Sequence, residues 1–369
     1  MYYDALVTGA GPGGCMAARS LRGAGFKVAL VEKERLPREK PCGGFVSPQA
    51  AALIEEAFGP IPPSCLAQPH TVVGARLLCE GGGDYELPFP EPGFSVVRSR
   101  LDAHLAASCG ADVLDGCEVV DLDVERFHVR AHVTRGEEEE EELEATYLVA
   151  ADGAESVALR LLRPEFHRLY AAPRLERTML VLSEGDMEWD PRWTGIALMR
   201  GGGGIARFFV KDGLIGLAVN HGPEKEWREG LDSLAAMLRH RAGLRLRGEA
   251  IRRASASNRM AAGGHYSLGA GCALLAGEAA GLLDPWGFGI RLALESGRVA
   301  AESIRESAGE RITPHIRYRY RMQDLLEREL RQRRDFTAGV GDLDVSSLAG
   351  DRSRAARRDR RALKRRFYK

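Results

Sequence analysis

A glycine-rich turn between an apolar strand and a helix constrains the fold of this chain more than any other feature. Residues 5–7 predict a short buried strand, and the GAGPGG sequence that follows leads into a helix ending near Gly23. In such a turn Gly9 permits the tight bend, Gly11 lets the backbone approach a pyrophosphate, and Gly14 lets helix and strand pack closely. The pattern predicts a Rossmann-like unit that holds phosphates at a helix N-terminus.

A second apolar strand, residues 27–31, ends at Glu32. The Glu32 carboxylate is placed to accept hydrogen bonds from the ribose hydroxyls of an adenosine, and its charge disfavours a 2′-phosphate. FAD or NAD fits this arrangement, whereas NADP does not. A glycine-rich turn without a nucleotide is the alternative, and the strand, helix and acid in register argue against it. Lys33, the next residue, is counted among the candidate cofactor contacts.

The segment 274–297 provides a place for the ring of a flavin. Residues 272–276 predict a buried strand, and a helix begins at Ile290. The unpaired amides at that helix start favour an anionic group, and a reduced flavin is an anion. Between strand and helix, four glycines leave the backbone bare enough to lie against a flat ring: Gly277, Gly281, Gly287 and Gly289. Together with the N-terminal turn, this segment predicts that a whole FAD is bound.

The composition is that of a folded chain with balanced charge. The 369 residues are enough for two domains, and 44% of them are hydrophobic. The 52 basic and 52 acidic residues give a formal charge of zero, which favours no nucleic-acid partner. The sequence has no apolar run long enough to span a membrane and no leader pattern at its start. A cytoplasmic protein is expected.

The seven cysteines and nine histidines give no sign of a metal centre or a hydrolase. The cysteines form no CxxC pair and no metal-ligand spacing, and their odd number argues against a disulfide framework. The histidines form neither a Ser-His-Asp pattern nor a ligand cluster. A reducing compartment and no bound metal are therefore expected.

Three regions are expected in an α/β chain that is α+β overall. They are a Rossmann-like FAD-binding domain, an inserted antiparallel sheet for the substrate, and a helical, basic C-terminal region. The boundaries expected are 1–70, 98–155 and 262–305 for the first, 71–97 and 156–261 for the second, and 306–369 for the third.

Turn residues and apolar runs place the main elements within these regions. Helices are expected at residues 48–58, from about 98 to 110 and at 226–240, and a connector at 60–69. The glutamates 137–142 are expected to form a solvated hairpin tip, and the glycines 201–204 a hairpin turn. Strands are expected at 71–79, 85–89, within 113–133, and at 147–151, 179–182, 195–199, 205–210 and 214–220.

Several separated motifs together resemble the geranylgeranyl reductase family of FAD-dependent oxidoreductases, within the group that shares the p-hydroxybenzoate hydroxylase fold. The resemblance covers roughly residues 1–305, and the KPCGG sequence at 40–44 is the motif that points to the reductases. The other motifs are GAGPGG with Glu32, RSRLD at 98–102, ADGAES at 151–156, GEAAGLLDPWGFGI at 277–290, and Ser296 with Gly297.

The resemblance implies a set of site residues. Cys42 is the candidate proton donor or redox relay, in a loop with Gly43 and Gly44, and Lys40 nearby favours a thiolate. An inert buried thiol is the alternative. Arg98 is a candidate cofactor contact, with a surface salt bridge as the alternative. Asp152 with Gly153 either bonds the ribityl chain or shapes the turn.

The chain departs from the family pattern in two places. Glu278 stands where the family has Asp, and a carboxylate there can still bond the ribityl hydroxyls. In place of the Tyr-x-Trp-x-Phe-Pro pattern of the prenyl-lipid reductases, residues 205–211 read IARFFVK, so that Arg207 brings a cation toward the site. Phe208, Phe209 and Trp286 are the candidate substrate-pocket residues, with ordinary sheet core as the alternative for the two phenylalanines.

The resemblance implies a reductase of prenyl-type double bonds, in which reduced FAD delivers a hydride and a proton reaches the other carbon. A hydrophobic or lipid substrate is expected, with NAD(P)H or ferredoxin as external electron donor. Alternatives are a flavin monooxygenase or halogenase-like enzyme, a quinone-directed electron-transfer flavoprotein, and a non-catalytic scaffold. The basic tail 352–369 is either a solvated helix or a peripheral contact with anionic lipid at the inner membrane face.

Overall fold

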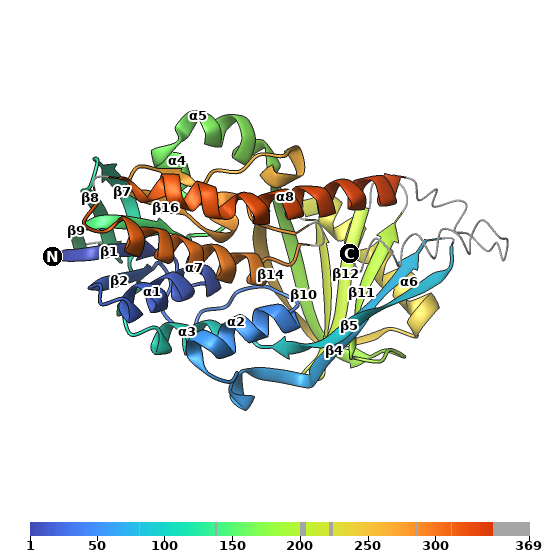
Figure 1. The fold of residues 1–369 in the computed structure, drawn as a ribbon. Coiled ribbons are helices and arrows are strands. Elements are labelled where there is room, and N and C mark those ends of the chain that lie inside the picture. The colour runs from blue at the N-terminus through green and yellow to red at the C-terminus, as the bar shows by residue number, and fades with distance from the viewer. Residues whose placement is uncertain are drawn as a thin grey trace.

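Two eight-stranded sheets, named sheet A and sheet B, organise the computed structural model of the chain. Figure 1 shows sheet A at the end of the molecule that holds the N-terminus and sheet B at the other end, with long helices bridging the two. The structure describes residues 1–80, 82–136, 139–199, 204–220, 224–284, 287–310 and 312–341.

Sheet A is the Rossmann-like unit. Its strands lie in the order β15-β16-β9-β1-β2-β6, and β7 and β8 extend antiparallel from β9. β1 pairs in parallel with β2 and β9, because a helix carries the chain back between β1 and β2. The strands span Tyr2–Thr8 (β1), Val28–Glu32 (β2), Asp112–Asp115 (β6), Glu118–Val124 (β7), Val129–Arg135 (β8), Glu139–Ala150 (β9), Gly269–Ala270 (β15) and Ala273–Leu275 (β16).

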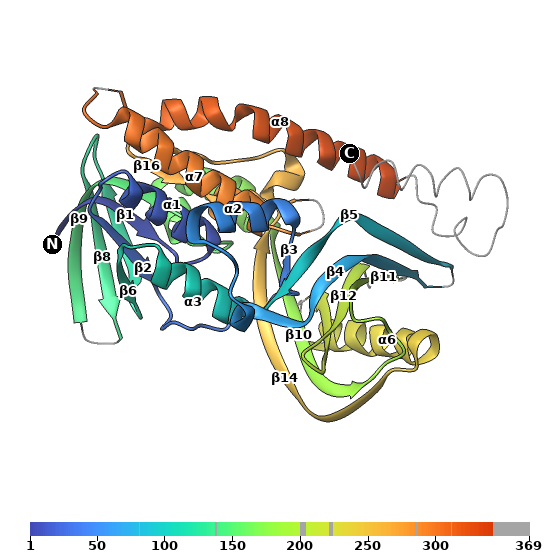
Figure 2. The ribbon, with the colours of Figure 1, turned by 60° about the horizontal axis from the view of Figure 1, so that its bottom comes forward.

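The helices α1 and α7 lie together on sheet A, and α8 runs along α7 toward sheet B (Figures 1 and 2). The approach of α1 and α7 requires glycine, because a Cβ on Gly297 would lie 2.1 Å from the carbonyl oxygen of Gly13. The α-helices span Pro12–Gly23 (α1), Pro48–Phe58 (α2), Arg98–Ser108 (α3), Val157–Leu162 (α4), Pro164–Phe166 (α5), Glu224–Ala242 (α6), Ile290–Ser307 (α7) and Pro314–Gly341 (α8).

Sheet B is curled and mostly antiparallel, with one parallel pair between β4 and β11. Its strands lie in the order β14-β10-β13-β12-β11-β4-β5-β3. They span Phe45–Val46 (β3), Leu66–Cys79 (β4), Asp84–Val96 (β5), Leu175–Asp186 (β10), Trp193–Met199 (β11), Gly204–Lys211 (β12), Leu214–Asn220 (β13) and Arg245–Asn258 (β14).

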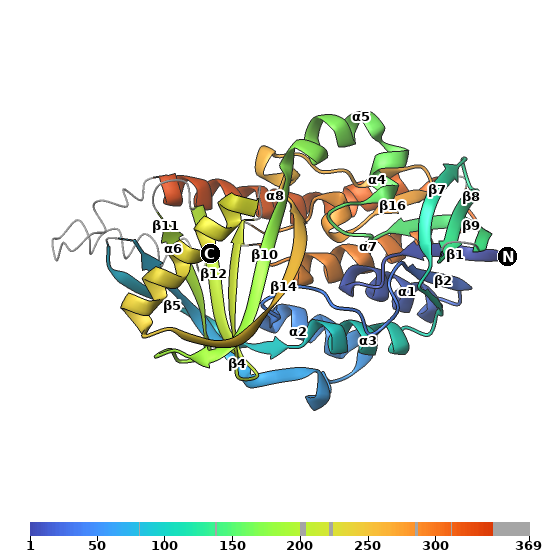
Figure 3. The same ribbon diagram turned by 180° about the vertical axis from the view of Figure 1, so that it is seen from behind.

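The helix α6 covers one face of sheet B, as Figure 3 shows from behind. Its buried Trp227, Leu234 and Leu238 pack with Phe208 and Leu217 of the sheet in a separate hydrophobic core. Because alternate residues of a strand face opposite sides, the opposite side chains of β12 face away from α6. Those side chains are available to the candidate site.

Several expected elements differ from the observed ones. The connector at 60–69 is shorter than expected, since β4 already begins at Leu66 and continues through Pro69 beside an irregular stretch of its pairing with β5. Glu139 to Glu142 form the start of β9, paired with β8, whereas Glu137 and Glu138 lie outside the described residues. β14 is an edge strand that we did not expect, because its arginine-rich sequence shows no apolar alternation.

No helix among the described residues is both long enough and apolar enough to cross a membrane. The basic tail at 352–369 and the glycines 201–203 lie outside the described residues. β11 and β12, which flank those glycines, pair antiparallel from Met199 and Gly204 onward.

Candidate active site

The N-terminal glycine turn leaves one open face. A Cβ on Gly14 would lie 1.9 Å from the Gly9 carbonyl oxygen, and one on Gly9 would lie 2.4 Å from the Ala151 carbonyl oxygen. A Cβ on Gly11 would instead meet only the Arg38 guanidinium, at 3.9 Å. No side chain of the described residues caps the first turn of α1, so its amides remain available to phosphate oxygens.

Four charged side chains form a buried network beside this turn. The Glu32 carboxylate accepts a hydrogen bond from the Ala10 amide at 2.9 Å and pairs with Arg38 at 3.1 Å. Arg38 also pairs with Asp102 at 3.1 Å. Arg98 donates two hydrogen bonds of 2.9 Å to the same Asp102 carboxylate. The Asp102 charge raises the pKa of both arginines against the opposing effect of burial.

This network corrects part of the sequence interpretation. Arg98 forms a buried ion pair rather than a surface salt bridge, and it lies between the phosphate-binding turn and Cys42. Arg38 was not anticipated, although its place in the charged loop directly after Glu32 could have pointed to it. Lys33 is exposed and, unlike Glu32, has its side chain directed to solvent.

Two partly buried carboxyl groups face the middle of the site. Asp152 accepts a hydrogen bond from the Ala158 amide at 3.1 Å, so it shapes the turn that Gly153 enters with φ +86°. Its other oxygen, Oδ1, is buried and has no hydrogen-bond partner in the described part of the chain. Glu278 accepts a hydrogen bond from the Asn258 amide at 3.3 Å. Burial raises the pKa of both carboxyl groups, and the charge of Lys40 opposes that effect at Glu278.

The glycine loop that follows Glu278 has the backbone shape that its sequence predicts. Gly277, Gly281 and Gly287 all have positive φ, at 58°, 86° and 84°. Gly289 is the N-cap residue of α7, and Ile290 is its first residue. No side chain of the described residues bonds to that cap, so the first amides of α7 can receive an anionic group.

Cys42 lies on a second loop, with three cations around its sulfur. The Gly44 amide donates a hydrogen bond to Cys42 Sγ at 3.3 Å. Arg98 bonds to Cys42, and the charges of Arg207 and Lys211 also act on it. Cys42 is partly exposed, whereas the other six cysteines are buried.

The loop around Cys42 is held against sheet B by its glycines. Gly44 is buried with φ +71°, and a Cβ there would lie 2.1 Å from the Val96 carbonyl oxygen. Lys211 from β12 donates hydrogen bonds to the carbonyl oxygens of Val96 and Gly43. Gly43 is exposed, so the loop presents bare backbone next to Cys42.

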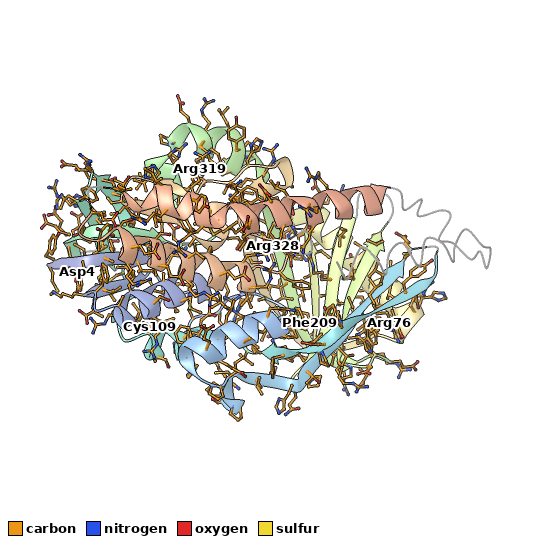
Figure 4. All side chains as sticks on the ribbon, viewed as in Figure 1. Asp4, Arg76, Cys109, Phe209, Arg319 and Arg328 are labelled. Carbon is orange, nitrogen blue, oxygen red and sulfur yellow. The ribbon has the colours of Figure 1, made fainter. Side chains whose placement is uncertain are left out.

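Partly buried aromatic rings line the same region. The Phe45 ring contacts Phe89 and Phe288, with centroids 5.0 and 5.1 Å apart. Phe209 packs over Gly216 and approaches Gly43, and Figure 4 labels it on sheet B. Phe45, Phe89 and Phe288 were missed because strand patterns alone do not say which rings meet.

The assignment of Phe208 to the substrate pocket is wrong. Its side chain is fully buried, and it packs edge-on against Trp189 on the α6 side of sheet B. Phe208 and Phe209 are adjacent on β12 and therefore face opposite sides of the sheet. Arg207, Phe209 and Lys211 lie on the opposite face, toward the site. Trp286, the third pocket candidate, lies outside the described residues.

The C-terminal helix α8 binds the glycine loop at Leu283 and α7 at Arg291. Arg333 donates a hydrogen bond to the Leu283 carbonyl oxygen within that loop. Glu329 pairs at 2.7 Å with Arg291, the second residue of α7, which also pairs with Glu295 at 2.9 Å. Glu329 and Arg333 are both buried, and their spacing of one helical turn was the available sequence signal.

These features fit a flavin dinucleotide. The open face of Gly11 suits a pyrophosphate, the unpartnered Asp152 Oδ1 suits a ribityl hydroxyl, and the uncapped start of α7 suits an anionic ring. Within the described residues, no group of three His, Cys, Asp or Glu side chains could hold a metal ion.

Comparison with known proteins supports this assignment. A family model described as an FAD binding domain matches residues 2–172. The menaquinone reductase of Mycobacterium tuberculosis is 30% identical over 337 residues, which are 85% of this chain and 79% of that protein. The geranylgeranyl diphosphate reductase of Rhodobacter capsulatus is 35% identical over 164 residues, which are 42% of this chain and 39% of that protein.

Solved structures share the fold. A geranylgeranyl bacteriochlorophyll reductase-like protein from Thermoplasma acidophilum matches with a TM-score of 0.73 and 22% identity, over 94% of this chain and 90% of that chain. The flavin-dependent brominase Bmp2 matches with a TM-score of 0.69 and 19% identity, over 99% and 94% of the two chains. The predicted α/β fold is confirmed, and FAD is the cofactor of the site.

Proposed function

Because the chain belongs to the geranylgeranyl reductase family of FAD-dependent oxidoreductases, we propose that it reduces carbon–carbon double bonds in the prenyl chain of a lipid. The names of the two curated relatives support this substrate class, since geranylgeranyl diphosphate and menaquinone both carry prenyl chains. The observation that carries the proposal is the loop position of Cys42, whose Sγ accepts a hydrogen bond from the Gly44 amide at 3.3 Å, beside the bare backbone of Gly43 that Phe209 approaches and Lys211 binds.

Reduced FAD, when bound, supplies a hydride to one carbon of the double bond. The other carbon must then receive a proton, and the Cys42 thiol is the donor that we assign to this step. The S–H bond breaks, the C–H bond forms, and a thiolate is left on the sulfur. Arg98, Arg207 and Lys211 stabilise that thiolate, and water returns the proton after the product leaves.

The residues around Cys42 serve to hold an apolar chain and to keep water away. Phe45, Phe89, Phe209 and Phe288 offer flat apolar surfaces beside the bare backbone of Gly43. An isolated double bond is a poor hydride acceptor, so its orientation relative to the hydride donor and to Cys42 matters. Fixing the reacting groups in one geometry can contribute roughly 7–11 kcal/mol toward the barrier.

The remaining site residues hold the cofactor. The first turn of α1 and Arg38 are placed for the pyrophosphate, Glu32 for the adenosine ribose, and Asp152 and Glu278 for the ribityl hydroxyls. The start of α7 is placed for the negative charge of the reduced ring.

Anaerobic turnover tests this function. The FAD-loaded protein is reduced with dithionite under argon and mixed with a panel of geranylgeranyl diphosphate, geranylgeraniol and menaquinone. We expect flavin absorbance to return with a prenyl substrate, and NMR to show loss of vinyl protons from the chain. Reduction of the menaquinone ring with an intact prenyl chain would contradict the proposal.

A monooxygenase or halogenase-like enzyme remains the alternative outcome, because flavin-dependent brominases share the fold. Such an enzyme would leave the reduced flavin unchanged under argon. It would consume oxygen and return a hydroxylated or halogenated product. A protein whose bound flavin no donor can reduce would instead be a scaffold without catalytic activity.

A further inference from the structure

We propose that Arg207 and Arg259 form a binding site for the oxyanion head group of the substrate, a phosphate or diphosphate. This inference rests on the proposed function and narrows its substrate class. It places the charged head group beside the glycine loop and the prenyl chain along the aromatic rings.

The geometry of the two arginines carries the inference. Arg207 comes from β12 and Arg259 from the residue after β14, so different strands direct them to one point. That point is Gly287, where a Cβ would lie 3.2 Å from Arg207 Nη2 and 3.4 Å from Arg259 Nη2. Two guanidinium groups that converge in this way match the spread oxygens of a phosphate.

The electrostatics of the pair favour an anion between them. Burial lowers the pKa of Arg207, and the nearby charge of Arg259 lowers it further. Asp284 and Glu176 act in the opposite direction. Glu176 binds Arg259 through Nε at 3.0 Å, which leaves the Nη2 side of that guanidinium directed to Gly287. An oxyanion there would add to the compensation that Asp284 and Glu176 already give to these two cations in a partly desolvated position.

The neighbours of the pair indicate an amphiphile rather than a free ion. Phe288 follows Gly287 in the chain and contacts Phe45, and Phe209 lies two residues from Arg207 on the same face of β12. The two arginines therefore lie next to a surface made of phenylalanine rings. A phosphate with a prenyl tail matches both parts. The phosphates of a nicotinamide cofactor would suit the two arginines, but that cofactor has no apolar tail for the phenylalanine rings.

Binding titrations test the site without depending on turnover. Oxidised, FAD-loaded protein is titrated with geranylgeranyl diphosphate and with geranylgeraniol, and the flavin absorbance change reports binding. We expect the diphosphate to bind more tightly than the alcohol. Arg207→Gln should weaken diphosphate binding roughly tenfold to a hundredfold and leave alcohol binding unchanged. Arg207→Lys should recover part of the loss.

Arg253→Gln is the matched control, because Arg253 is an exposed arginine on β14. Its diphosphate affinity should equal that of the wild type. If Arg207→Gln loses its FAD, competition in the wild type decides instead, where inorganic pyrophosphate should displace the diphosphate and not the alcohol.

Three results would overturn the inference. They are equal affinities of the wild type for diphosphate and alcohol, equal weakening of both ligands by Arg207→Gln, and weakening confined to NAD(P)H. Binding of the diphosphate without its reduction would leave the head-group site standing and contradict the proposed function. Reduction of the diphosphate and of the alcohol, with equal affinities for the two, would leave the proposed function standing and contradict the head-group site.

Discussion

Among the seven cysteines, Cys42 is the one whose side chain is both partly exposed and close to basic side chains. It is partly exposed, and Arg98, Arg207 and Lys211 act on its sulfur, whereas the other six cysteines are buried. Lys40, the cation that the sequence suggested for it, acts on Glu278. The assignment of Cys42 as proton donor therefore depends on residues from α3 and β12 that are distant in sequence.

Cys42→Ser should keep FAD and lose most double-bond reduction. A serine hydroxyl is a much weaker acid than a thiol, and a positioned proton donor contributes about a hundredfold or more to rate. Single-turnover reoxidation of the reduced flavin by substrate measures the loss. Cys65→Ser, at a buried thiol, serves as the control. A Cys42→Ser variant that turns over at the wild-type rate would remove the sulfur from the mechanism.

Glu278 predicts a pH-dependent stability of the FAD-free protein. Burial raises the pKa of this carboxyl above its ordinary value of 4.5, so the folded protein holds the proton more tightly than the unfolded chain does. Its contribution to the free energy of unfolding is therefore most favourable in acid and is lost as pH rises through that raised pKa.

Glu278→Gln removes the ionised form. We expect the variant without FAD to have a higher thermal midpoint than wild type at neutral pH, and the difference to shrink in acid. Calorimetry of both FAD-free proteins across that range measures it. A difference that stays constant with pH would show that burial of this carboxylate carries no such penalty.

At the scale of elements, α8 fixes the position of the glycine loop. Arg333 holds the Leu283 carbonyl oxygen, and Glu329 holds Arg291 at the start of α7. The loop between these two points contains Gly287 and Gly289. A substitution in α8 should therefore alter FAD binding through the position of the glycine loop, although no described residue of α8 is placed against the flavin.

Glu329→Gln should lower the free energy of unfolding by roughly 1.5–3 kcal/mol, because it removes a charged hydrogen bond to Arg291 that Glu295 replaces only in part. It should also weaken FAD binding and shift the flavin reduction potential, which loss of general stability alone would not do. Arg328→Gln, at an exposed position of α8 that Figure 4 labels, is the control. An unchanged potential in Glu329→Gln would limit α8 to a structural role.

The sequence predicted best those elements whose ends carry local signals. α2 was predicted with its observed bounds, because Ser47 caps it and Pro48 begins it. The start of α7 at Ile290 was likewise readable from the preceding glycines. β14 lacked such a signal, since its residues are polar and its place is set by pairing with β10.

The site was predictable only in part for the same reason. The glycine turns and Glu32 follow from local pattern, whereas the pairing of Arg38 with Asp102 and of Glu329 with Arg291 joins segments that are distant in sequence. The choice between Phe208 and Phe209 depended on which face of β12 meets α6. That choice is set by tertiary packing rather than by residue type.

At the scale of the whole molecule, the site is assembled from both ends of the chain. In the proposed site, β1, β2 and α1 are placed for the phosphate end of FAD, the glycine loop and α7 for the ring end, and sheet B for the substrate (Figures 1 and 2). Sheet B carries one of the two departures from the family pattern, the segment 205–211 with Arg207 and Phe209, whereas the other, Glu278, lies in the glycine loop. The proposed function therefore predicts that changes in sheet B alter the choice of substrate while FAD stays bound.

Stoichiometry in a single anaerobic turnover tests the central claim most directly. Protein carrying reduced FAD is mixed with a limiting prenyl substrate, and the flavin oxidised is compared with the double bonds lost. The proposed mechanism predicts one flavin oxidised for each double bond that gains two hydrogen atoms. Flavin that stays reduced until oxygen is admitted, with every double bond intact, would contradict it.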